Sequence, residues 1–136
     1  MTEGAADDDT TLARIRVLCS EFPEAAEARL QGRPLFHVRR RRFAIFNGDT
    51  SPVHRRWQAF GRSLHVVADA AQHLRLQGDS RFRPSPHHGF RGWLAVDVTP
   101  IAIAWVELAV LLEHAYRAVA GRELVAELER QRQSST

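Results

Sequence analysis

The chain has 136 residues, a length that gives one domain a proper hydrophobic core and leaves little room for a second domain. Its hydrophobic fraction of 44% and charged fraction of 26% are ordinary for a soluble globular protein. The longest nearly apolar run, residues 101–112, is interrupted by Glu107 and is too short to cross a bilayer, so we expect no membrane partner.

Charge is distributed unevenly along the sequence. Residues 33–91 contain 12 arginines and three acids, a local balance of +9, whereas the two flanks together carry −6. All 19 basic residues are arginine, in the acidic flanks as well as in the middle, so a coding bias explains the choice of arginine but not its clustering. A basic middle between acidic ends predicts one cationic surface, and nucleic acid is the commonest partner of such a surface.

The N-terminal part predicts a tail followed by a helix. Residues 1–8 are small and acidic and are expected to be a disordered tail, and Asp9 or Thr10 is placed to cap a helix. Apolar residues then recur at helical spacing until Pro23 ends the helix. An acidic start is the reverse of a signal peptide, and the single cysteine, Cys19, forms no intramolecular disulfide, so we expect a cytoplasmic protein.

Short runs of aromatic and branched residues predict the strands of a sheet. Residues 35–38 and 43–46 fit a hairpin whose basic tip is residues 39–42. The next elements are a strand at 64–67, a short helix at 68–76 ended by Gly78, a loop or irregular edge strand at 81–92, and a strand at 93–98. The side chains expected to line the buried face of the sheet include Phe43, Ile45, Leu64, Val66, Leu94 and Val96.

Two helices are expected near the C-terminus. Residues 104–120 predict the longest helix, with Gly121 placed to end it, and residues 122–131 predict a final helix. The buried stripe of the longest helix is expected to be Trp105, Leu108, Leu112, Ala115, Tyr116 and Val119. This order of elements indicates an α+β fold, a single two-layer domain in which an antiparallel sheet has helices packed on one face.

Six stretches, in chain order, carry a resemblance to a known family. They are LCSEFPEA at 18–25, GRPLFHV at 32–38, FAIF at 43–46, FRPSP at 82–86, GFRGWLAV at 89–96 and WVEL at 105–108. Together they resemble the MmcQ/YjbR family over most of residues 11–120. The resemblance implies a compact two-layer domain similar to the frataxin-like fold, and members of this family are often described as DNA-binding because of a proposed double-wing motif.

The resemblance also suggests how the chain is divided. The expected parts are the acidic tail at 1–8, an MmcQ/YjbR-like domain at 9–121, and a C-terminal helix extension and tail at 122–136. Residues 50–62, with Trp57 and Phe60, depart from the tight hairpin of the family.

The basic hairpin is the first candidate site. The residues expected to contact DNA phosphates are Arg39, Arg40, Arg41, Arg42, Arg55 and Arg56. No asparagine or glutamine of this region lies on a predicted recognition helix, so we expect weak DNA binding that is indifferent to sequence. The alternative interpretation is a solvated turn whose charges keep a sheet edge from pairing.

A small anionic ligand is the alternative partner. The same fold can hold such a ligand in a cleft, either as a binding module or as an unrecognised enzyme. The residues expected to line this cleft are Arg33, His37, His65 and Arg91. An exposed basic ridge favours nucleic acid, and a concave pocket with convergent polar groups favours the ligand.

The sequence assigns no catalytic residue, cofactor or metal. It contains no P-loop, dinucleotide fingerprint, HExxH motif or nucleophile elbow. His87 and His88 are adjacent, so on an extended segment they point apart, and no second pair has metal-ligand spacing.

Overall fold

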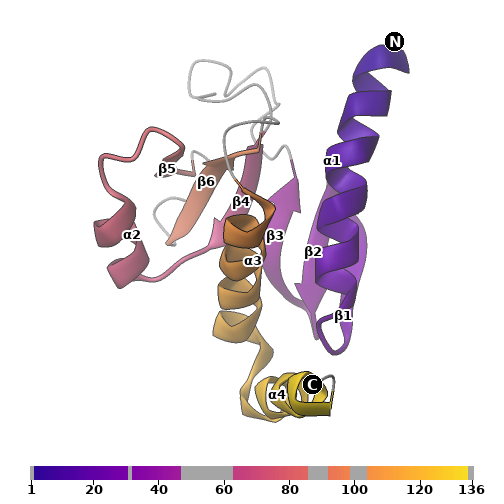
Figure 1. Ribbon diagram of the computed structural model, residues 1–136, viewed down its shortest axis with the longest axis vertical. Helices are drawn as coiled ribbons and strands as arrows, with labels where there is room; N and C mark the ends of the chain where they lie inside the picture. The colour runs from indigo at the N-terminus through magenta and orange to yellow at the C-terminus, as the bar shows by residue number, and fades with distance from the viewer. Residues whose placement is uncertain (1, 31, 47–62, 86–91, 99–103, 135–136) are drawn as a thin grey trace.

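The computed structural model describes residues 2–30, 32–46, 63–85, 92–98 and 104–134 (Figure 1). Its helices and strands are α1 (Thr2–Ser20), β1 (Ala25–Leu30), β2 (Arg33–Val38), β3 (Arg41–Phe46), β4 (Ser63–Val67), α2 (Ala70–Leu76), β5 (Phe82–Pro84), β6 (Trp93–Asp97), α3 (Trp105–Ala120) and α4 (Arg122–Ser134). All the strands join one antiparallel sheet in the order β1-β2-β3-β4-β6-β5.

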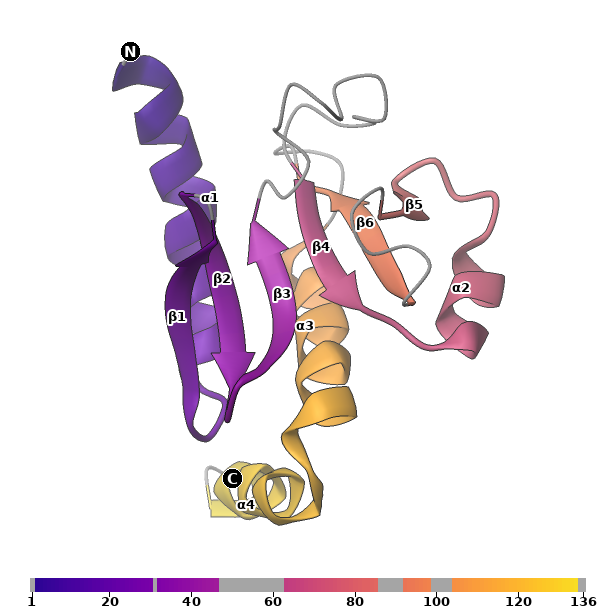
Figure 2. The ribbon, with the colours of Figure 1, turned by 180° about the vertical axis from the view of Figure 1, so that it is seen from behind.

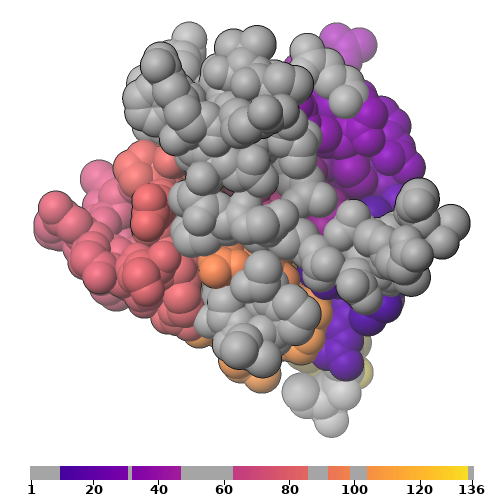
Figure 3. All heavy atoms as spheres, turned by 90° about the horizontal axis from the view of Figure 1, so that it is seen from above, coloured from indigo at the N-terminus to yellow at the C-terminus, as the bar shows by residue number. Residues whose placement is uncertain are grey.

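The helices α1 and α3 lie across the same face of this sheet (Figures 1 and 2). Helix α4 follows beyond the end of α3, and α2 lies beside β5 and β6. Seen from above, the α2–β5 region and the strands β1 and β2 are on opposite sides of the molecule (Figure 3). The expected α+β fold, with an antiparallel sheet and helices on one face, is confirmed.

The main hydrophobic core lies between the sheet and the helices α1 and α3. Its fully buried side chains include Ile15, Phe43, Leu64, Val66, Leu108, Leu112 and Tyr116. The ring of Phe22 stacks on Tyr116 with centroids 4.8 Å apart. The hydroxyl of Tyr116 donates a 2.7 Å hydrogen bond to the carbonyl of Pro23, which fixes the turn after α1 to the C-terminal half of α3.

The expected stripe of α3 is largely confirmed. Four of its six members are buried, while Trp105 and Val119 are partly buried at the margin of the core. Gly121 follows the helix with a φ of 92°, a conformation that glycine adopts without strain.

A β-bulge in β3 interrupts its pairing with β2. Phe36 pairs with Ala44. The next residue of β2, His37, pairs with Arg42, which leaves Phe43 without a partner on β2. An extra residue reverses the alternation of side chains beyond it, because successive residues of a strand point to opposite faces.

Because of the bulge, one side chain expected in the main core lies elsewhere. Ile45 was expected on the same face as Phe43, but it lies on the opposite face, in a small second cluster with Leu35 and Trp93. Phe46 instead reaches the main core, where it is 2% exposed.

Strand β1 lies outside the elements expected from the sequence. Its residues, AAEARL, have low strand propensity and show no apolar alternation. It forms because it pairs with β2 over six residues, from Ala25 opposite Val38 to Leu30 opposite Arg33. This pairing is a tertiary contact that a local pattern does not carry.

The helix α1 begins earlier than expected, at Thr2 rather than at Asp9 or Thr10, so the segment 2–8 is helical. A helix already packed over its later turns extends one residue at a time at low cost. The acidic residues near its start are favoured there by the helix dipole.

The replacement Leu112→Ala is expected to lower the free energy of unfolding by about 2–5 kcal/mol, because it leaves a cavity in the core. Leu112 is 0% exposed in α3. Val110 on the same helix is 63% exposed and supplies the matched control, Val110→Ala, which should change stability by less than about 0.5 kcal/mol. Urea denaturation followed by circular dichroism measures both. Equal effects of the two replacements would mean that the stripe is not buried.

Candidate anion-binding surface

The turn of the basic hairpin is shorter than expected. Only Arg39 and Arg40 form it, with φ of 47° and 70°, and Arg41 and Arg42 belong to β3. Two successive residues with positive φ are the mark of a type I′ hairpin turn, whose twist matches that of the strands. The four adjacent arginines therefore point in different directions.

Arg39 is neutralised by acids from other parts of the chain. Its Nε and Nη2 donate to the two carboxylate oxygens of Glu24, at 2.8 and 3.1 Å. Its Nη1 lies 3.5 Å from a carboxylate oxygen of Glu123 on α4. The hydrogen bond from Arg39 lowers the pKa of Glu24, so this pair stays charged at neutral pH.

The other hairpin arginines divide between the two faces of the sheet. Arg41 turns toward the helices, where its Nη1 donates a 3.3 Å hydrogen bond to the carbonyl of Val119, near the end of α3. Arg42 stands opposite His37 and points to the face that the helices do not cover. Arg40 and Arg42 are exposed, and within the described residues neither has a hydrogen-bond or ion-pair partner. Arg55 and Arg56 lie outside the described residues.

The face of the sheet away from α1 and α3 is called here the open face. Alternation along the strands places Arg33, His37 and His65 on it, which are three of the four residues expected to bind a small anion. The fourth, Arg91, lies outside the described residues. Arg83 of β5 also points to the open face, because it pairs with Ala95 in the same row as His65.

His65 lies at the centre of the open face and is fully buried. Its Nδ1 is 2.7 Å from the hydroxyl of Ser85, and its Nε2 is 3.4 Å from the hydroxyl of Ser63. A neutral imidazole has one donor and one acceptor nitrogen, and a hydroxyl serves either role. These contacts hold His65 in the interior of the molecule. The Nδ1 of His37, in contrast, is buried and has no hydrogen-bond partner among the described residues.

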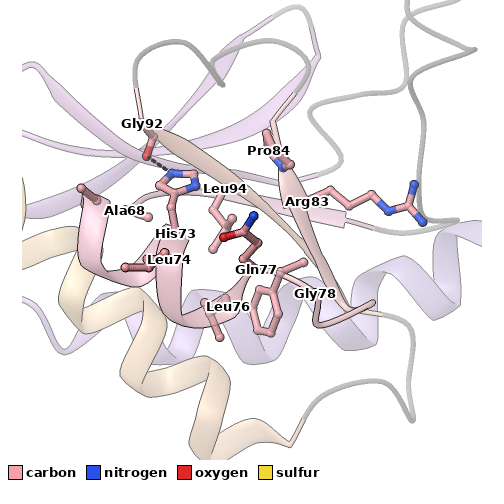
Figure 4. A pocket seen from close by; sticks show the side chains of 12 residues that line it. Ala68, His73, Leu74, Leu76, Gln77, Gly78, Arg83, Pro84, Gly92 and Leu94 are labelled. Carbon is pink, nitrogen blue, oxygen red and sulfur yellow. Dashed lines mark hydrogen bonds between the residues drawn. The ribbon is translucent and has the colours of Figure 1, made fainter.

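A cavity of about 690 Å³ lies between α2 and the strands β5 and β6 (Figure 4). Most of its lining is apolar or backbone, and its larger apolar side chains are Leu74, Leu76, Phe82 and Leu94. His73 enters from α2, where its Nε2 donates a 3.2 Å hydrogen bond to the carbonyl of Gly92. The guanidinium of Arg83 points away from α2 (Figure 4). No motif in the sequence marks this cavity.

Arg81 is used within the fold and does not add to the cationic surface. It donates to both carboxylate oxygens of Asp79, at 3.1 and 2.8 Å, and to both of Glu107, at 2.8 and 3.0 Å. Because Glu107 belongs to α3, this contact ties the start of β5 to the helix layer.

The described ranges contain no group of three or more histidine, cysteine, aspartate or glutamate side chains close enough to hold a metal ion. They also contain no helix with the length and apolar character needed to span a bilayer. The thiol of Cys19 is 3% exposed, and burial raises its pKa, so it stays protonated.

The fold of this chain is similar to that of a solved structure. The crystal structure of Deinococcus radiodurans protein DR2400, which has a DUF419 domain, matches with a TM-score of 0.64 and 19% sequence identity, over 87% of each chain. No family model matches the chain, and no curated protein matches it either. The likeness shows that the two chains share the α+β fold described above.

The carboxyl group of Asp79 is expected to titrate near pH 2, because hydrogen bonds from Arg81 lower its pKa from the usual 3.8 to about 2. The folded-state pKa lies below the unfolded one. The stability that this pair contributes is therefore fully present above about pH 4 and is lost as the pH falls toward 2. NMR titration of the carboxyl carbon measures the midpoint, and Arg81→Gln should raise it toward the usual value, because the guanidinium bonds are lost while the bond from the backbone amide of residue 81 remains. A midpoint near 4 in the unmodified protein would contradict the contact.

Proposed function

We propose that the chain is a member of the MmcQ/YjbR family and binds DNA weakly, without sequence preference, through arginines of the β2–β3 hairpin and the open face. Two observations support the family assignment. The six sequence stretches occur in the order of the family, and the fold is shared with a protein of the related DUF419 group.

The observation that carries the DNA proposal is the state of Arg40 and Arg42. Both are exposed, and neither is engaged by another described residue. A guanidinium without an internal partner is available to replace the counterions of a phosphate backbone. Arg39 and Arg41 are occupied by carboxylates and a helix carbonyl, so they contribute less than their place in the sequence suggests.

The spacing of the arginines favours an extended polyanion over a small one. Arg42 stands opposite His37. His37 is four residues along β2 from Arg33, so Arg42 and Arg33 are separated by roughly 13 Å along the strand direction. Arg83 lies on β5, four strand positions across the sheet from Arg33 on β2, so the two residues are roughly 19 Å apart in that direction. A small anion is too short to contact all three residues at once, whereas successive phosphates of a nucleic-acid backbone span such distances. In the described strands, Asp97 is the single acid on this face.

The DNA affinity is expected to fall with salt at a log–log slope of about −3 to −4 if Arg33, Arg40, Arg42 and Arg83 each engage a phosphate. Fluorescence anisotropy with two short duplexes of unrelated sequence measures the slope and should give similar affinities for both. The double replacement Arg40→Ala/Arg42→Ala should flatten the slope by about two units.

A matched control removes the same charge elsewhere. Arg75 on α2 and Arg130 on α4 are exposed, so Arg75→Ala/Arg130→Ala should leave the slope nearly unchanged. Absence of binding at low salt, or equal slopes for the two double variants, would show that the hairpin arginines form only a solvated turn.

A small anionic ligand remains the second candidate, favoured by one observation. His37 lies on the same face of β2 as Arg33, and its buried Nδ1 has no hydrogen-bond partner within the part of the chain that the structure describes. A buried polar atom without a partner is costly, and a ligand that bonds to it removes that cost.

Thermal-shift measurements with phosphate, citrate and a nucleoside monophosphate test this candidate. If it is correct, one of these anions raises the melting temperature and short DNA does not, because only a ligand bound to the folded state stabilises it. Arg33→Ala should abolish that shift, and Arg40→Ala/Arg42→Ala should leave it intact. Stabilisation by DNA alone would contradict the small-ligand candidate.

A further inference from the structure

Strand β1 forms one edge of the sheet as far as the structure describes it. In the described part of the chain the strand order begins with β1, and no further strand pairs with its outer side (Figure 2). On its inner side β1 pairs with β2 over all six residues without a shift in register. Apart from the pairing with β2 and the bond from the Ala25 amide to the Phe22 carbonyl, the β1 backbone makes no backbone hydrogen bond to another described residue.

This edge lacks three of the features that usually prevent edge strands from pairing, namely proline, a bulge and a very short length. Proteins protect exposed edges with proline, lysine, bulges or very short strands. β1 has six residues, no proline and a regular ladder to its neighbour, and its two charged residues, Glu27 and Arg29, alternate to the helix side. The other edge strand, β5, has only three residues and ends in Pro84. The two edges are therefore not equivalent, and β1 is the one open to strand addition.

When two copies of β1 pair antiparallel, one register places their opposite charges across from each other. When two copies of β1 pair about a twofold axis at Ala28, Glu27 of each copy stands opposite Arg29 of the other. Ala26 then stands opposite Leu30. A register centred on Glu27 or on Arg29 places two like charges directly opposite each other, which is unfavourable. Charge therefore selects the register centred on Ala28.

The two faces of β1 suit this pairing. Alternation places Glu27 and Arg29 on the helix side, where Glu27 already binds Arg16 through both carboxylate oxygens at 2.7 Å. Each carboxylate oxygen has a second lone pair, which leaves Glu27 able to accept from a further arginine. On the open face, Ala28 and Leu30 are partly buried against the small cluster around Ile45. Pairing of two copies brings these two clusters together and removes apolar surface from water.

We propose that the chain forms a twofold-symmetric dimer by antiparallel pairing of β1 with β1 of a second copy, centred on Ala28. The sheets of the two copies then form one continuous sheet, and both open faces lie on the same side of it. The surface is isologous, so each copy supplies the same residues. This inference does not depend on the proposed DNA binding, which concerns other residues.

Charge reversal in single and mixed variants tests the dimer. The unmodified chain should sediment as a dimer at micromolar concentration in analytical ultracentrifugation. Glu27→Arg alone and Arg29→Glu alone should each weaken dimerisation at least about tenfold, because each places two like-charge pairs across the axis. An equimolar mixture of the two variants should restore a dimer, because every Arg then faces a Glu. Arg130→Glu on α4 changes charge away from the edge and should leave the dimer intact.

A second measurement keeps the test decisive if Glu27→Arg disturbs the fold through loss of its bond to Arg16. Hydrogen exchange of the outward-facing β1 amides should be slow in the unmodified dimer and fast in Arg29→Glu, while α3 amides stay protected in both. A monomer up to the highest soluble concentration, or dimerisation unaffected by Arg29→Glu, would overturn the proposal. If the unmodified chain forms the dimer but does not bind DNA, that result contradicts the proposed function and not the dimer.

Discussion

Side chains point alternately to the two faces of a sheet along a strand unless the strand contains an extra, bulged residue. Strand β3 contains such a residue, Phe43. This bulge lets Phe43 and Phe46 both enter the main core, at 0% and 2% exposure, although they are separated by an odd number of positions. It also turns Ile45 to the open face, where it pairs with His65. The composition of both faces depends on this single residue, because a strand without it would exchange Ile45 and Phe46.

The hairpin that contains the bulge is attached to the rest of the fold by its charges. Arg39 bridges Glu24 after α1 and Glu123 at the start of α4, and Arg41 bonds to a carbonyl near the end of α3. A cation at a helix C-terminus is favoured by the helix dipole. Four adjacent arginines thus have different roles, and the local excess of positive charge does not form one continuous patch. Only the part that remains exposed is relevant to an external anion.

Much of the fold was readable from local patterns. The stripe of α3 and the alternation of β4 and β6 involve many residues with a strong periodic signal, and each is found as expected. β1 was not predicted, because its stability comes from pairing with β2 rather than from its own residues. The bulge was not predicted either, because the run FAIF is apolar throughout and carries no sign of which residue is extra.

Less of the candidate site than of the fold could be predicted from the sequence. That Arg33, His37 and His65 share a face follows from strand alternation, once the pairing of the strands is known. The pairing of Arg39 with Glu24 joins residues 15 positions apart, and no spacing rule predicts it. The buried contact of His65 with Ser85 depends in the same way on the strand order, in which β6 lies between β4 and β5.

The contact between Tyr116 and Pro23 has a consequence for synthesis of the chain. Its partners are 93 residues apart, so the apolar side of α1 and the rings of Phe22 and Phe43 lack their cover until α3 has been translated. At about 5–20 residues per second, this interval lasts roughly 5–19 seconds. The hairpins β1–β2 and β2–β3 involve only nearby residues and can form earlier. The N-terminal half therefore leaves the ribosome with part of the helix side of its sheet covered by α1 and the part under α3 still exposed to water.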